Sequence, residues 1–250
     1  GWAPNLTRGG SFDKDGKNVL VSPPRMVPRA MPSRTLERYQ TMKAGDSSRP
    51  VFMTLTGDFH PFFKKWSDEQ RNSLYPQYIK ATDIVGYDIY PIYGWNKPEW
   101  IHLVYEATGL LTDLAKPRPV YAWIETSKGS RWTGELERQK EVRPDHIRAE
   151  VWMAVCGGAT VIGYFTHIWK PSYAQFGVPP ENREALANIN AQLTRLAPAI
   201  LGSVPQRTVS VASDTGAKLG LLARQSGSDL YVFVVNYDER LKAAKATFSV

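Results

Sequence analysis

Two carboxylates stand at or near the ends of apolar segments, where an ionisable side chain has the greatest scope for chemistry. Glu125 closes the apolar run 120–124, and Asp88 lies within the run 84–90. A charged group in such a setting is costly unless it is paired or functional. Two interpretations stay open for each residue. Glu125 is catalytic or has simply reached solvent at a strand end, and Asp88 serves a ligand or bonds to neighbouring loop amides.

Aromatic and histidine side chains follow the same apolar segments. The chain contains 8 Trp, 12 Tyr and 9 Phe. Pyranose rings offer apolar C–H faces that stack on such rings, and their hydroxyls bond to carboxylates. The pattern therefore favours a sugar ligand, although each histidine could equally be structural. The candidate contact residues are Tyr90, Trp95, Trp123, Tyr164, Trp169, His60 and His167.

Composition and motifs exclude several other classes. No apolar run approaches the roughly 18 residues of a membrane span, and the single cysteine, Cys156, excludes an internal disulfide framework. The four histidines lie far apart, without an HExxH pair, so the sequence indicates no metal site. The net charge of +7 is scattered, which argues against a nucleic-acid partner. Neither GxGxxG nor GxxxxGKS/T, the glycine-rich phosphate motifs, is present.

The apolar segments alternate with helical patterns, which predicts an α/β fold with a parallel sheet. Ser67 and Gln70 form a capping box at the start of the second helix, and Pro76 is expected to break or kink it. Pro198 is expected to end the last helix. Strands are predicted at 51–55, 84–90, 119–125 and 159–165, and helices at 33–43, 68–81, 99–114, 145–155 and 181–196.

The two flanking regions differ from this alternation. Residues 1–32 show no periodicity and predict a long loop, with a short extended piece at 18–21. After Gly202 the pattern changes to short strands joined by Gly, Ser and Asp turns, which predicts an antiparallel β domain over 203–250 beside an α/β domain over 1–202. These strands are expected at 208–212, 219–224, 230–236 and 246–250.

Four motifs, RPVFMTLTGDF, DIVGYDIYPIYGW, RPVYAWIETS and GGATVIGYFTHIW, resemble strands five to eight of a clan A glycoside hydrolase. The resemblance implies a (β/α)8 TIM barrel, whose C-terminal half occupies residues 1–202. The start of a small β-sandwich would then occupy 203–250. The other half of the barrel would come from upstream sequence or from another chain.

The resemblance also implies retaining hydrolysis of O-glycosidic bonds in an oligo- or polysaccharide, with Glu125 as nucleophile. Tyr90 would contact the nucleophile or the sugar, and Trp169 would form the aromatic floor under the sugar. For Trp123, His60 and Asp88, the resemblance gives weaker support for a role in contacting the sugar. This reaction requires neither a metal nor an organic cofactor.

One departure from the clan opens an alternative. The acid/base Glu of the clan closes strand four, which would precede Gly1, and no carboxylate within residues 1–30 fits that role. The chain could therefore be a non-catalytic carbohydrate-binding relative, or a basic scaffold or surface-adhesion protein with a structural barrel. A polysaccharide ligand would suit a secreted, periplasmic or cell-surface bacterial protein.

Overall fold

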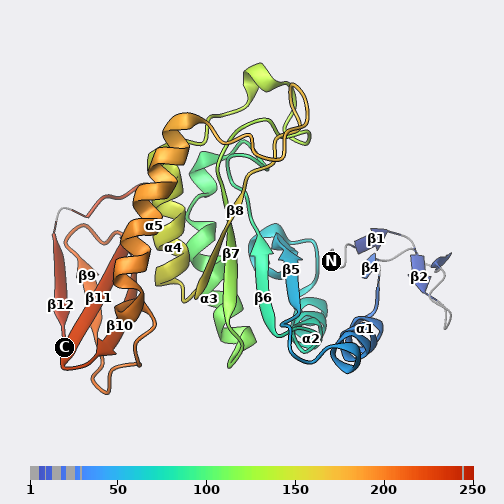
Figure 1. Ribbon diagram of the computed structural model, residues 1–250, viewed down its shortest axis with the longest axis horizontal. Helices are drawn as coiled ribbons and strands as arrows, with labels where there is room; N and C mark the ends of the chain where they lie inside the picture. Colours follow the sequence, from blue (N-terminus) through green and yellow to red (C-terminus); the bar gives the residue numbers. More distant parts are fainter. Residues whose placement is uncertain (1–5, 9, 13–17, 21–25, 29, 244) are drawn as a thin grey trace. The chain divides into compact units, whose positions relative to one another are not determined.

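Four apolar segments of the sequence form a parallel sheet in the order β5-β6-β7-β8 (Figure 1). The computed structural model describes residues 6–8, 10–12, 18–20, 26–28, 30–243 and 245–250. Helices alternate with the sheet strands along the chain, which confirms the predicted α/β class; closure into a barrel stays a prediction. The strands are β5 Phe52–Thr56, β6 Ile84–Asp88, β7 Val120–Glu125 and β8 Val161–Phe165.

By its internal contacts the chain divides into two compact units. Unit 1 comprises Gly1–Asp88 and Leu110–Tyr121, and unit 2 comprises Ile89–Gly109 and Ala122–Val250. The strands after Gly202 group with unit 2, so this division does not fall at residue 202. The predicted domain boundary there stays a prediction.

Unit 1 contains the pair β5–β6, whose parallel register runs from Phe52 opposite Ile84 to Thr56 opposite Asp88. Helices α1 (Pro32–Gly45) and α2 (Asp68–Ile79) pack against each other. The capping box predicted at the start of α2 is confirmed. Of the two outcomes expected at Pro76, the break does not occur, because α2 continues past it while the nearby side chains of Tyr75 and Tyr78 are buried; the kink stays a prediction.

The long loop predicted over residues 1–32 contains short strands. β1 (Leu6–Arg8) pairs antiparallel with β4 (Met26–Pro28), and β2 (Gly10–Phe12) pairs antiparallel with β3 (Asn18–Leu20). Strands of three residues are too short to show an alternation in the sequence, which explains why the pattern predicted a loop. The extended piece predicted at 18–21 is confirmed for 18–20, and Val21 lies outside the described residues.

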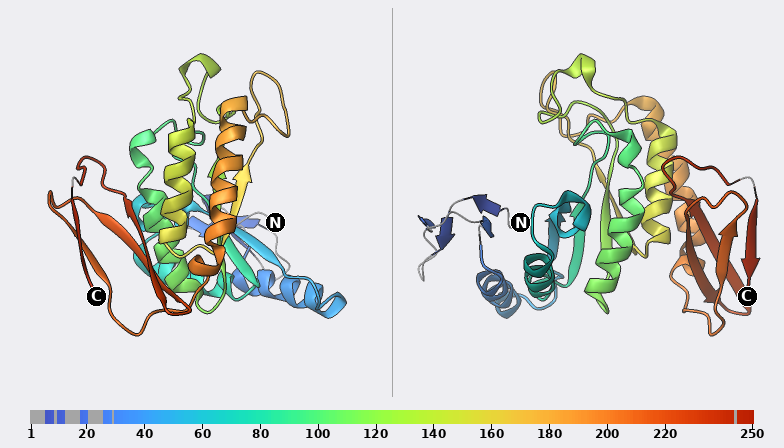
Figure 2. Two further views of the ribbon diagram at one scale, coloured as in Figure 1. Left: turned by 60° about the vertical axis from the view of Figure 1, so that its left-hand side comes forward. Right: turned by 180° about the vertical axis from the view of Figure 1, so that it is seen from behind.

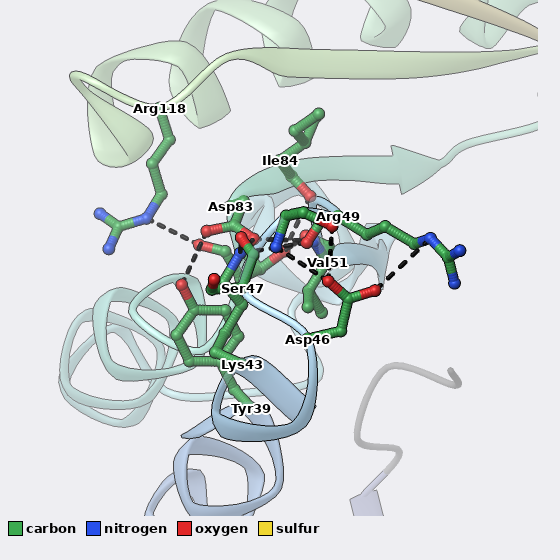
Figure 3. A network of polar contacts seen from close by, with 11 residues as sticks. Tyr39, Lys43, Asp46, Ser47, Arg49, Val51, Asp83, Ile84 and Arg118 are labelled. Atoms are coloured by element: carbon green, nitrogen blue, oxygen red, sulfur yellow. Dashed lines mark hydrogen bonds and ion pairs between the residues drawn. The ribbon is translucent and has the colours of Figure 1, made fainter. Parts of the chain in front are cut away.

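A network of hydrogen bonds ties α1 to the beginnings of β5 and β6 (Figure 3). Asp83 accepts hydrogen bonds from the Tyr39 hydroxyl at 2.7 Å, the Val51 N–H at 2.8 Å and the Lys43 ammonium at 3.2 Å. These bonds, that from Tyr39 first, hold the pKa of Asp83 below its ordinary value. We call Tyr39, Lys43, Val51 and Asp83 the Asp83 clamp.

Unit 2 contains the helices α4 (Pro144–Cys156) and α5 (Pro180–Ile200), which lie side by side (Figure 2). An apolar core that includes Val155, Ile200 and Leu222 joins these helices to the strands after Gly202. Those strands pair antiparallel, β10 with β11 and β9 with β12, as predicted. They are β9 Ser210–Ser213, β10 Leu219–Ser226, β11 Asp229–Asn236 and β12 Ala246–Ser249.

Several element ends differ from the prediction, and three of them change how the sequence is interpreted. β6 ends at Asp88, so Tyr90 lies in the following loop. The helix expected from residue 99 is divided into a 3-10 turn, Pro98–Trp100, and α3, Leu103–Ala115. α5 passes Pro198 because the Leu201 N–H reaches the Ala197 carbonyl at 2.9 Å and closes the last turn beyond the proline.

Two glycines make room for the large side chains of β7. A Cβ at Gly86 would lie 2.3 Å from the Tyr121 ring, and one at Gly163 would lie 2.5 Å from the Trp123 ring. Each ring therefore occupies the space above a glycine in its own unit. Among the described helices, none combines the length and apolar character needed to cross a membrane.

Candidate functional site

Glu125, the last residue of β7, is fully buried at 0 % exposure. Its carboxylate accepts hydrogen bonds from two consecutive backbone N–H groups in the loop after β6. The Ile92 N–H lies 2.9 Å from Oε1, and the Tyr93 N–H lies 2.5 Å from Oε2. Two adjacent amides that converge on one carboxylate form a small anion-binding nest.

Glu150 on α4 lies close to Glu125 and is also fully buried. Neither of its carboxyl oxygens has a hydrogen-bond partner of good geometry among the described residues. Even so, each carboxyl changes the pKa of the other. Burial raises the pKa of Glu125 to about 7, and burial together with the Glu125 charge raises the pKa of Glu150 well above its ordinary value.

The different surroundings of these carboxyls decide where the proton lies. The Ile92 and Tyr93 amides stabilise the charged form of Glu125. The Glu125 N–H favours the charged form of Glu150, but burial and the Glu125 carboxyl outweigh it. We therefore place the proton of the Glu125–Glu150 pair on Glu150 at neutral pH. Two carboxyls that share one proton are a recurrent feature of functional sites, although structural pairs also exist.

Aromatic rings from two loops gather beside this pair. Tyr90 and Tyr93 follow β6, and Phe165 and His167 belong to the end of β8 and the loop beyond it. The Phe165 ring lies 4.9 Å from Tyr90, 5.3 Å from Tyr93 and 5.3 Å from His167. Tyr93 thus links the carboxyl pair to the aromatic rings, since its N–H binds Glu125 and its ring contacts Phe165.

The ring contacts continue outward to solvent. Tyr173 lies 6.0 Å from His167 and 5.0 Å from Trp169, which in turn lies 6.0 Å from Trp132. Trp132 and Tyr173 are 57 % and 56 % exposed. The rings form one continuous surface, and we call it the aromatic cluster: Tyr90, Tyr93, Trp132, Phe165, His167, Trp169 and Tyr173.

Two buried amide side chains hold the loop after β7 in place. The Gln139 carbonyl accepts from the Gly129 and Ser130 N–H groups, both at 2.9 Å, and its amide donates to the Ser130 carbonyl at 2.7 Å. The Asn182 amide donates to the Thr126 carbonyl at 2.8 Å. Because these bonds fix the backbone around 126–139, the rings of this loop are presented by an ordered segment.

Several residues predicted from the sequence lie outside the aromatic cluster. The Tyr164 hydroxyl donates to Asn190 on α5 at 2.7 Å, and Trp95 contacts Trp100 at 6.1 Å. Trp123 lies over Gly163. Of the predicted set, the structure brings together Tyr90, His167 and Trp169 with Glu125 beside them.

Asp88 and His60 belong to unit 1. Burial raises the pKa of Asp88 to about 7, and the nearby charge of Asp58 adds to this shift. Asp58 itself forms an ion pair with Lys65 at 2.8 Å. His60 accepts a hydrogen bond from the Phe62 N–H at 3.3 Å, so its ring caps a short 3-10 turn.

Residues of this region that were not among the sequence candidates include Glu150, Arg131, Trp132 and Tyr173. Glu150 could have been recognised from the sequence, because it places a carboxylate on the apolar face of a helix. That face is formed by Ile147, Val151 and Ala154. The other three lie in loops, where no periodicity marks them. In the part of the chain that the structure describes, no group of three or more His, Cys, Asp or Glu residues is arranged to hold a metal.

Comparisons with known proteins place the chain in no family. No protein-family model matches it, and the search of curated proteins gave no match. Among solved structures it is similar to a candidate alpha-L-fucosidase from Bacteroides thetaiotaomicron, with 12 % identity and a TM-score of 0.43. The match covers 67 % of this chain and 52 % of that protein, so the chain spans about half its length. A likeness this distant identifies neither the family nor the activity of the chain.

Proposed function

We propose that this protein binds a carbohydrate at the aromatic cluster. The observation that carries the proposal is the unbroken series of ring contacts from buried Tyr93 to exposed Trp132 and Tyr173. Large rings that remain exposed beside polar groups are typical of a binding surface rather than a core. A sugar ring offers the matching combination of apolar faces and hydroxyls.

Binding can be measured by titrating the full chain with oligosaccharides while following tryptophan fluorescence. A glycan array of neutral and acidic sugars would first select the probe. We expect Trp132→Ala to weaken the selected sugar at least tenfold, because each tenfold corresponds to about 1.4 kcal/mol. Phe62→Ala, which removes an exposed ring of unit 1, is the matched control and should change nothing. Equal affinity for wild type and Trp132→Ala would contradict the proposal.

A second candidate function is retaining glycoside hydrolysis, with Glu125 as nucleophile and this chain as half of a (β/α)8 barrel. Its support is the position of Glu125, at the end of a parallel strand and beside the aromatic cluster. In this reaction Glu125 attacks the anomeric carbon, and a partner carboxylic acid protonates the leaving oxygen. The full burial of Glu125 favours the binding proposal, because a nucleophile must reach the sugar and its oxygens already accept the Ile92 and Tyr93 N–H groups.

Activated 2-fluoro-glycosides separate the two functions. Their leaving groups depart without acid assistance, so labelling requires a nucleophile but no acid/base residue. An adduct in the intact mass that maps to Glu125, and that Glu125→Gln abolishes, would establish the hydrolase. Sugar binding without any adduct would support the binding protein.

A further inference from the structure

Arg131 lies between two tryptophan rings at the exposed end of the aromatic cluster. Its guanidinium carbon is 4.6 Å from the centre of the Trp132 ring and 4.3 Å from that of Trp169. Stacking on a tryptophan uses the flat face of a guanidinium and leaves the N–H groups at its edge available. The two indole rings lie at 78° to each other, so the guanidinium can lie flat against only one of them, and the N–H groups along its remaining edges stay available.

The charge of Arg131 is not neutralised within the described part of the chain. No described residue forms an ion pair with its guanidinium or accepts a hydrogen bond from it, and the residue is exposed. The lysines of the neighbouring loops differ, since Lys128 pairs with Glu141 and Lys170 lies 3.7 Å from Glu135. Arg131 is therefore the cation of this surface that keeps its donors for a ligand.

Two buried donors accompany it. The Tyr93 hydroxyl and the Trp169 indole nitrogen are buried and interact with each other, and neither has another hydrogen-bond partner among the described residues. Tyr93 is 2 % exposed, so its hydroxyl cannot be satisfied by bulk water. Arg131 and Trp169 both lie close enough to Tyr93 to lower the pKa of this hydroxyl, against the larger effect of burial. The Tyr93 O–H is therefore a buried donor without an acceptor among the described residues, and its position beside a cation indicates that an anionic ligand group belongs here.

We propose that Arg131, with Tyr93 and Trp169 beside it, forms a subsite for the carboxylate of an acidic sugar, a hexuronic acid residue of the bound carbohydrate. The inference rests on the proposed function, since it assigns a substrate class to the aromatic cluster. The planar fork of a guanidinium matches the two oxygens of a carboxylate, and the indoles supply the stacking face for the sugar ring. A neutral sugar would leave the guanidinium without a partner.

The test compares uronic acid trisaccharides with their methyl esters. The esters keep the sugar rings and linkages but remove the negative charge, so the pair isolates the carboxylate. Trisaccharides of galacturonic, glucuronic and mannuronic acid, each as acid and as ester, are titrated against the full 250-residue chain with tryptophan fluorescence as readout. The variant is Arg131→Gln, and Arg183→Gln, an exposed arginine of α5, is the matched control.

We expect at least one acid to bind tenfold or more tightly than its ester. Arg131→Gln should remove this preference while leaving the affinity for the ester unchanged, and Arg183→Gln should keep both. Added salt should weaken the acid alone. Equal binding of acid and ester, or a preference that survives Arg131→Gln, would overturn the acidic subsite and leave the carbohydrate site intact. If no acid or ester binds, and the glycan array also shows no bound sugar, then the proposed function is wrong and so is this inference.

Discussion

The Asp83 clamp in unit 1 and the Glu125–Glu150 pair in unit 2 use the same chemical group in opposite ways. Asp83 is partly exposed, bonds to a hydroxyl, an amide and a lysine, and has a lowered pKa. Glu125 is fully buried and has no cation beside it, so burial raises its pKa to about 7 even though Glu150 and the Ile92 and Tyr93 amides act in the opposite direction.

The difference separates a structural carboxylate from a candidate functional one. Every donor around Asp83 favours its charged form, so the clamp ties α1 to β5 and β6. The Glu125–Glu150 pair instead buries two carboxyls that can be accommodated together only by sharing a proton. Buried carboxyl pairs with strongly shifted pKa values occur preferentially at functional sites, where the choice of residues serves function rather than stability. The adjacent aromatic cluster with unpaired Arg131 is consistent with that interpretation.

Glu125→Ala should give the largest change in stability. It leaves the Ile92 and Tyr93 amides buried without an acceptor and opens a cavity at the end of β7. We expect a loss of about 2–5 kcal/mol in the free energy of unfolding, measured by urea titration. Glu184→Ala, on the exposed side of α5, is the control. A loss no larger than that of the control would show that the carboxylate does not hold the loop after β6.

Glu150→Gln should change how stability depends on pH. Both carboxyls have raised pKa values in the folded state, so the folded chain retains protons that the unfolded chain loses. Stability should therefore fall as the pH rises from about 4.5 to 7, by up to about 1.4 kcal/mol per pH unit for each retained proton. The variant removes one carboxyl and should flatten this fall. Parallel stability curves for wild type and variant would contradict the shared proton.

Asp83→Asn should have a smaller effect with the opposite dependence on pH. The pKa of Asp83 is lowered, so its contribution to stability is present above the ordinary aspartate pKa and disappears as the pH falls through the folded value. We expect a loss of about 1–2 kcal/mol at pH 7, which vanishes in acid. Asp113→Asn, which breaks an exposed ion pair with Lys116, provides the control. A loss that persists at low pH would mean that the charge of Asp83 is not what holds the clamp.

Tyr39→Phe should have the smallest effect, about 1 kcal/mol, because it deletes one hydrogen bond to Asp83 while the amide and lysine bonds remain. The same variant should raise the pKa of Asp83, which NMR titration of the carboxyl carbon can follow. An unchanged pKa would show that the hydroxyl is not the leading cause of its lowered value.

The sequence allowed prediction of the sheet and of the carboxylate at the end of β7, because alternating strands and helices leave a strong periodic signal. It could not identify Glu150 as the partner of Glu125, since that contact joins a helix to a strand end across 25 positions of the chain. The sequence did not point to the loop residues Arg131, Trp132 and Tyr173, because loops show no hydrophobic periodicity that would mark a position as buried or exposed. Of the short strands before α1, only the extended piece at 18–20 was predicted, and α2 continues past Pro76, where a break or a kink was expected.

The most direct test of the account is a parallel measurement of sugar affinity and stability for Trp132→Ala and Asp83→Asn. We expect Trp132→Ala to lose carbohydrate binding with little loss of stability, because the ring is exposed. We expect Asp83→Asn to lose stability but to bind the carbohydrate like the wild type at a temperature where it remains folded. Retained binding in Trp132→Ala, or binding lost in folded Asp83→Asn, would contradict the assignment of function to the aromatic cluster.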